Sequence, residues 1–192
     1  MGVKEEQKIE GWVEIIVKDK NGNIKLHIGS NKPPPSKECK NGHNCIEPTI
    51  LSALPSKFQD FYWRKNIITN VGLAAIIRLV FAGLTETKFS HLAIGTGTAA
   101  ESATDTALQN EVKRKTATIT QTTTTVSGDT ALCEATFSSA DTLSGTMNIS
   151  EAGIFNASTG GILLARKVFS AIPINWDAGD TLTIRYYVQM TR

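Results

Sequence analysis

The sequence predicts a mainly β protein: an antiparallel β-sandwich or jelly-roll-like barrel with an N-terminal β-hairpin and one buried α-helix at about residues 70–83. Three observations support this fold class. Strand-like segments follow one another from Phe89 to the end of the 192-residue chain. The links between them are rich in the turn residues Gly, Asp, Asn and Ser. The last segment, 181–190, alternates between two faces, one of them apolar, as in a sheet with one buried face.

The first predicted element is a β-hairpin over residues 12–28. Two alternating runs, WVEIIVK and NIKLHI, flank the turn residues DKNG. Asn21 and Gly22 tolerate the positive φ angles of tight hairpin turns. We therefore expect a first part, 1–65, made of this hairpin and an irregular loop region, and a second part, 66–192, made of the helix and the sandwich.

The segment 29–66 contains no recognisable helix or strand. Three consecutive prolines, 33–35, lack the N–H that a sheet ladder needs. Cys39, His43 and Cys45 follow in the loop sequence ECKNGHNC. A local disulfide, free thiols and a zinc site are all open, although the zinc pattern usually has two residues between cysteines and here lacks a fourth ligand.

Four aromatic residues end this segment: Phe58, Phe61, Tyr62 and Trp63. One interpretation is a platform on which a ligand stacks. The favoured one is that they hold the loop against the sandwich or against a neighbouring subunit, because large aromatic side chains dominate both cores and interfaces. We treat these residues as interface candidates.

A helix is predicted from Asn70, a good N-cap, through VGLAAIIRLVFA to a stop at Gly83. Its residues are apolar nearly all round, and Arg78 is the only strongly polar one. Such a helix is buried on more than one side, under a sheet or in a subunit interface. Ile77 and Phe81 on this helix are therefore further interface candidates.

Six strands are expected after the helix, and one helical turn is expected at 104–110, capped by Thr104 or Asp105. Cys133 alternates with Ala131, Ala135 and Phe137, which favours a small core residue. The predicted strands are 89–94, 111–126, 130–138, 146–155, 162–170 and 181–190.

Composition and charge narrow the function classes. Hydrophobic residues make up 41% of the chain, enough for a core, and a net charge of +2 is too small to predict a nucleic-acid partner. The compact basic run 113–115 alternates between strand faces and favours a solvated edge. The polar N-terminus lacks the apolar stretch of a signal peptide, and the longest apolar run, 71–84, is too short to span a bilayer. We expect no membrane insertion.

Two segments carry features of ligand-binding or catalytic sites. The run 94–100, IGTGTAA, has glycine spacing like a phosphate loop, but the following helix, the βαβ unit and the P-loop lysine are missing, which favours a tight turn beside the sheet. Glu151 is a charge in an apolar strand, and we expect it to bond to a neighbouring strand, since a buried charge needs a partner.

The remaining candidates for chemistry are few. His27, His43 and His91 lie in unrelated contexts, and no nucleophile elbow or metalloprotease motif is present. We therefore predict no catalytic residues, no cofactor and no enzymatic activity.

The order of segments resembles that of small virion structural proteins, tail-fibre-like or decoration-like, of tailed bacteriophages and tailed archaeal viruses. The motifs IGTGT…DTAL…EV and SEAGIFNASTGG carry the resemblance, which covers residues 66–192 and, loosely, the hairpin. The segment 29–65 has no counterpart in that family. The family has no shared catalytic residues to carry over.

The resemblance implies a non-enzymatic virion protein that associates with itself in a symmetric oligomer and docks on other virion proteins. Its place in the virion stays open between tail, baseplate, fibre attachment and capsid surface. The alternative from a different class is a host-surface or glycan-binding module, with the aromatic cluster or the strand-connecting loops as contact points. Loss of binding without loss of assembly in a Trp63→Ala variant separates the two.

Overall fold

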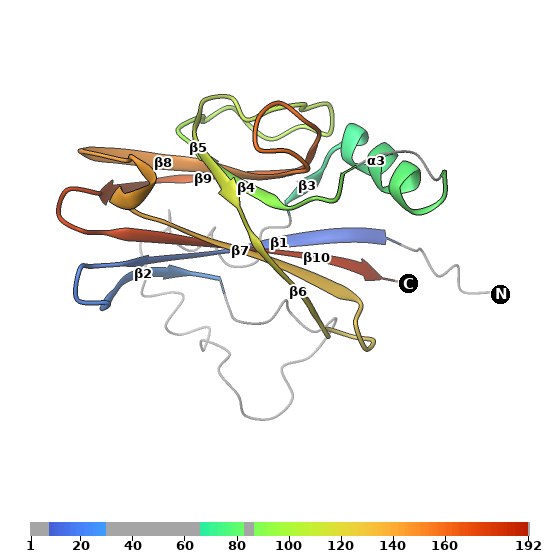
Figure 1. The fold of residues 1–192 in the computed structure, drawn as a ribbon, viewed down its shortest axis with the longest axis horizontal. Helices are drawn as coiled ribbons and strands as arrows, with labels where there is room; N and C mark the ends of the chain where they lie inside the picture. The colour runs from blue at the N-terminus through green and yellow to red at the C-terminus, as the bar shows by residue number, and fades with distance from the viewer. Residues whose placement is uncertain (1–7, 30–65, 83–86, 192) are drawn as a thin grey trace.

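Two five-stranded antiparallel sheets face each other in the computed structural model, which describes residues 8–29, 66–82 and 87–191 (Figure 1). Sheet A has the strand order β2-β1-β10-β7-β6, and sheet B has the order β3-β9-β8-β4-β5. This architecture confirms the predicted mainly β sandwich with an N-terminal hairpin and one helix.

The elements have the following bounds. The strands of sheet A are β1 (Lys8–Lys18), β2 (Ile24–Ile28), β6 (Thr118–Thr122), β7 (Thr130–Phe137) and β10 (Thr181–Thr191). The strands of sheet B are β3 (Ile67–Ile68), β4 (His91–Gly95), β5 (Glu111–Thr116), β8 (Thr146–Phe155) and β9 (Leu163–Asn175). The helix is α3 (Asn70–Val80), and a short 3-10 turn spans Ser139–Asp141.

The N-terminal hairpin is part of sheet A. Strand β1 pairs with β2 on one side and with the C-terminal strand β10 on the other, from Lys8 opposite Thr191 to Lys18 opposite Thr181. Figure 1 shows these two strands from opposite ends of the chain lying side by side. The turn forms as its residues predict, because Gly22 has a φ of 83° and the Asp19 carboxylate accepts the N–H groups of Asn21 and Asn23.

The predicted strand 111–126 is two strands in the structure. Strand β5 belongs to sheet B and β6 to sheet A, and the chain crosses between the sheets at Ala117. Ala117 is buried, and its N–H donates to the carbonyl of Ser90 at 2.8 Å. The crossing closes one side of the sandwich. Alternation alone did not reveal it, because both halves of the segment keep a strand-like pattern.

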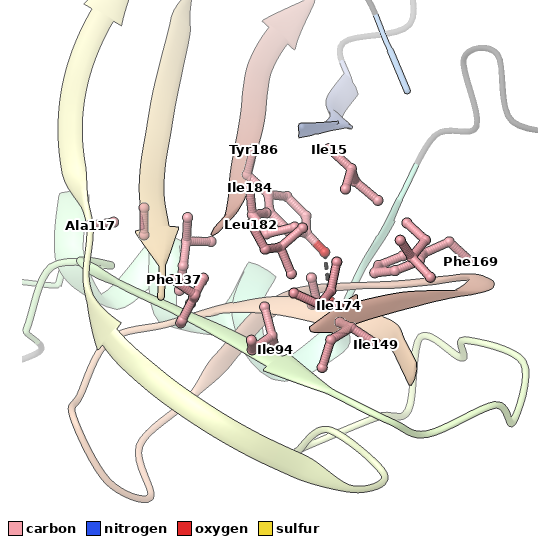
Figure 2. Close-up of a cluster of buried hydrophobic side chains, with 14 of the residues drawn as sticks. Ile15, Ile94, Ala117, Phe137, Ile149, Phe169, Ile174, Leu182, Ile184 and Tyr186 are labelled. Atoms are coloured by element: carbon pink, nitrogen blue, oxygen red, sulfur yellow. Dashed lines mark hydrogen bonds between the residues drawn. The ribbon is translucent and has the colours of Figure 1, made fainter. Parts of the chain in front are cut away.

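The core lies between the two sheets. Figure 2 shows Ile94, Ile149 and Ile174 of sheet B facing the side chains of sheet A, among them Tyr186. Tyr186 is fully buried, and its Oη donates to the carbonyl of Ala152 at 2.7 Å, so one side chain links the two layers. Burial also raises the pKa of Tyr186.

Cys133 is a core residue, as predicted. It is 4% exposed and lies opposite Tyr186 in the pairing of β7 with β10. Burial raises the pKa of its thiol to about 12, which keeps the thiol protonated and unreactive in the folded protein.

The N-cap of the helix lies one residue before the predicted Asn70, and the helix is less buried than its composition predicts. Thr69 is the N-cap, and its Oγ1 accepts the N–H of Gly72 at 3.0 Å. Regular helix ends at Val80, and the predicted stop at Gly83 lies outside the described residues. Only Gly72 and Ala75 are buried, against β9, where a Cβ on Gly72 would lie 2.7 Å from the Cα of Leu164. Within the described part of the chain, the helix is therefore covered on one side.

The helical turn predicted at 104–110 is absent. These residues form a turn at Thr104 followed by irregular, bent chain, and Asp105 accepts the N–H of Ser102 at 2.9 Å instead of capping a helix. The carboxylate of Asp105 is also bound by Arg166, a residue far away in the sequence. Asp105 therefore forms a tertiary ion pair with Arg166 rather than the predicted helix cap.

Asp129 stabilises the turn between β6 and β7. Its carboxylate accepts the N–H groups of Thr124, Thr125 and Val126 at 2.8–2.9 Å and the side-chain amide of Gln189 on β10 at 2.7 Å. Burial acts to raise the pKa of Asp129, but these hydrogen bonds outweigh it and hold the pKa well below its ordinary value of 3.8.

The variant Asp129→Asn should lose about 1 kcal/mol of unfolding free energy at pH 7, because an amide NH₂ replaces one acceptor and faces N–H donors. The lowered pKa of Asp129 gives a contribution that is complete above the unfolded-state pKa of about 4 and is lost as pH falls further. The difference between wild type and variant should therefore shrink below about pH 4. Urea unfolding from pH 7 to pH 3 measures it. Asp177→Asn, an exposed carboxylate that makes none of these bonds, is the control.

Candidate functional site

The most concentrated polar site of the described chain surrounds Glu151 on β8. This residue is 0% exposed, and all the donors around it come from outside β8. Its Oε1 accepts the backbone N–H of Gly97 at 3.0 Å and that of Asn110 at 2.7 Å, and its Oε2 accepts that of Gln109 at 3.0 Å. The expected bond to a neighbouring strand is also present, because Arg166 on β9 donates to Oε2 from Nε at 2.9 Å and contacts it from Nη2 at 2.8 Å.

Arg166 extends the site to a second carboxylate. Its Nη1 donates to Asp105 Oδ2 at 2.9 Å, and its Nη2 donates to the carbonyl of Ala99 at 3.2 Å. The guanidinium side chain is 3% exposed. Burial acts to lower the pKa of Arg166, but the hydrogen bonds and charges of Asp105 and Glu151 raise it overall, so the residue stays charged.

The segment 96–110 is held down by further side chains at both ends. Gln109 Oε1 accepts the N–H groups of Thr98 and Ala99 at 2.8 Å. Glu101 forms an ion pair with Lys167 and accepts the N–H of Val168 at 3.0 Å. The segment is therefore fixed to β8 and β9 by an internal network of charges and backbone donors.

The glycines of IGTGTAA serve close packing rather than phosphate binding. A Cβ on Gly95 would lie 2.6 Å from Glu151 Oε1 and 2.5 Å from the carbonyl of Asn110, and a Cβ on Gly97 would collide with the same carboxylate. The N–H groups of Gly97, Thr98 and Ala99 are already bound to Glu151 and Gln109. A phosphate would need those donors free, and the structure thus supports the tight-turn interpretation.

The arrangement around Glu151 is structural in its chemistry. A general base needs a lone pair that a substrate proton can reach, and a nucleophile needs access to the substrate. Both oxygens of Glu151 accept several bonds within the chain, and the side chain is closed to solvent. In the described residues, no group of three or more His, Cys, Asp or Glu side chains could hold a metal ion.

A second buried carboxylate lies on the outer face of sheet A. Glu14 is 1% exposed, and its Oε2 accepts the Tyr187 hydroxyl at 3.1 Å and lies 3.3 Å from Arg185 Nη1. His27 Nε2 is 2.6 Å from the other oxygen, Oε1. Arg185 also pairs with Glu134 on β7. Burial, together with the charge of Glu14, raises the pKa of Tyr187. This cluster ties β1, β2, β7 and β10 together.

The structure places two of the predicted interface residues and leaves the others untested. Ile77 lies on α3 and Phe81 is its C-cap, and the two side chains are 56% and 76% exposed. The remaining candidates lie outside the described residues, so their interpretations stay predictions. They are Cys39, His43, Cys45, Phe58, Phe61, Tyr62 and Trp63.

Sequence reasoning missed Arg166 and Glu14, and it assigned Asp105 to a helix cap rather than to the ion pair with Arg166. Arg166 carried a usable signal, because it is a charge in the apolar run GILLARKVF just as Glu151 is a charge in NISEAGIF. Two opposite charges in successive buried strands are natural partners. Glu14 was harder to recognise as a buried residue. In an alternating strand every second residue normally points to solvent, so a glutamate at such a position looks ordinary.

Comparisons with known proteins add no family. No protein-family model matches the chain, and no curated protein and no solved structure shows significant similarity to it. None of the helices in the described residues is long and apolar enough to cross a membrane.

The variant Glu151→Gln should lose about 3 kcal/mol or more of unfolding free energy, because it leaves Arg166 with less compensating charge in a buried site and turns an amide NH₂ toward N–H donors. Urea unfolding measures the loss. Glu111→Gln, which weakens the more exposed pair with Arg114, is the matched control and should lose about 1 kcal/mol or less.

The double variant Glu151→Gln/Arg166→Met completes the test. Its loss should be smaller than the sum of the two single losses, since removing both charges leaves neither one unpaired. Additive losses would contradict the coupling, as would a Glu151→Gln variant as stable as the control.

Proposed function

We propose that this chain is a non-enzymatic virion structural protein of a tailed virus, which associates with itself and docks on other virion proteins. The observation that carries the proposal is an apolar stripe on the exposed side of α3. We call it the outer helix face, and it consists of Leu73, Ile77, Val80 and Phe81, which are 41%, 56%, 60% and 76% exposed.

The outer helix face has the features of an unfilled contact. Residues 73, 77, 80 and 81 follow the spacing of one helix face, and none of them is polar. Four large apolar side chains side by side are uncommon on a surface that meets only water. A second copy of the same helix offers an equally apolar surface, so self-association buries both.

The interior supports an assembly role as well. The carboxylates of Glu151 and Glu14 are buried and bound by donors of the chain itself. Their polar groups fix the scaffold and leave the surface as the functional part. The segment order that resembles small virion proteins covers 66–192, the part that holds the outer helix face and most of the sandwich.

The double variant Ile77→Glu/Phe81→Glu should remove or greatly weaken self-association, because apposed copies would then bring like charges together in an apolar contact. Light scattering after size-exclusion chromatography measures the mass over a range of concentrations. Val126→Glu, which changes an exposed apolar residue in the β6–β7 turn, is the control and should assemble as wild type does.

Two outcomes would contradict the proposal: a wild-type protein that stays monomeric at high concentration and is missing from purified virions, or a double variant that assembles as wild type does. A folded double variant is recognised by its unfolding transition in urea, which should stay close to that of wild type, since both side chains are exposed.

A further inference from the structure

We infer that the free edge of β6 is a second self-association site, at which β6 of one copy pairs antiparallel with β6 of another and joins two A sheets. The inference rests on the proposed function and names one of its contacts. Among the strands that the structure describes, β6 ends the order of sheet A and pairs on one side only, with β7. Its other side carries backbone N–H and C=O groups that a strand of another chain can bind.

The other sheet ends carry the features that keep edge strands apart. Strand β2 has Lys25 and His27 and a register shift in its pairing with β1. Strand β5 has the basic run 113–115 and a register shift in its pairing with β4. Strand β3 is two residues long. Charge, bulges and shortness are the usual protections of an edge.

Strand β6 has none of these protections. Its sequence is Thr-Ile-Thr-Gln-Thr, without charge or proline, and its pairing with β7 runs in regular register. Four of its five residues are exposed, among them Ile119 at 41%. A regular, uncharged, β-branched edge is the kind of strand that pairs with another chain.

The sequence of β6 fits a copy of itself. In an antiparallel pair centred on Thr120, Thr118 faces Thr122 of the other copy and Ile119 faces its Gln121. The Thr–Thr pairs favour this register. All five residues of the strand are uncharged, so no like charges oppose each other in this pair.

The strand pair acts together with the outer helix face. Five residues a side bury less than the roughly 800 Å² per partner of a stable dimer. The two contacts lie on opposite sides of the sandwich, because β6 follows the crossing from β5 whereas α3 packs on β9, next to the β3 edge. One chain can therefore make both contacts at once, and the assembly should contain more than two copies.

The test uses cysteine substitution in a Cys39→Ser/Cys45→Ser background. Two copies of Thr120→Cys should form a disulfide-linked dimer on oxidation, because facing residues of an antiparallel pair have Cα atoms about 4.5–5.5 Å apart, within disulfide range. Thr118→Cys is the matched control. Its two copies lie about 13 Å apart in this register and should stay unlinked. The thiol of Cys133 is buried in the core and should not take part in the oxidation.

A charge variant gives the second readout. Ile119→Lys should reduce the mass of the assembly, because it places a charge on the paired edge, where the lysines of the two copies would be diagonal neighbours. Val126→Lys, an exposed position in the turn beyond β6, should assemble as wild type does. Light scattering measures both masses.

The outcomes separate the two ideas. A wild type that stays monomeric at high concentration overturns this inference, and it overturns the proposed function as well if purified virions lack the protein. A wild type that assembles, with Ile119→Lys at the same mass or with Thr118→Cys cross-linking as readily as Thr120→Cys, overturns the β6 contact alone and leaves the proposed function standing.

Discussion

The ion pair between Glu151 and Arg166 is the constraint on which the architecture of sheet B depends. A carboxylate with no solvent exposure loses its hydration, and the loss is offset only if hydrogen bonds and an opposite charge replace the water. Arg166 and three backbone N–H groups supply that replacement. The three N–H groups belong to a segment between β4 and β5, so the segment must fold back over β8. The glycines at 95 and 97 follow from this, because any side chain there would occupy the position of the carboxylate.

The fold was predictable from the sequence where one local pattern decided the outcome. Strand β8 has the predicted bounds, and β7 and β10 end within one residue of theirs, because strand-favouring residues bounded by turn residues are a strong local signal. The predictions failed where a distant residue decided. Ala117 turns the chain into the other sheet because Ser90 takes its N–H, and Asp105 forms no cap because Arg166 binds it. The partner of Glu151 was predicted only as a neighbouring strand, since pairing order is a tertiary property.

The helix shows the same limit in a different form. Its apolar composition predicted burial on more than one side, yet Gly72 and Ala75 alone are buried, against β9. Composition reports how much apolar surface a segment has and says nothing about which surface covers it. The excess apolar side of α3 fits a contact outside the chain, and this is why the outer helix face bears the proposed function. The buried polar clusters complement it, because side chains engaged in fixing the scaffold leave recognition to the surface.

The two proposed contacts differ in the interaction that stabilises them. The outer helix face gains from removing apolar side chains from water, and that gain is non-directional, so it sets affinity more than geometry. The β6 edge gains from backbone hydrogen bonds, which are directional and fix the angle and register between copies. An assembly protein needs both properties, because a symmetric particle forms only when each contact has one geometry. Three of the four edge strands in the described part of this sandwich are protected against pairing and only β6 is not, so a single strand fixes the geometry of that contact.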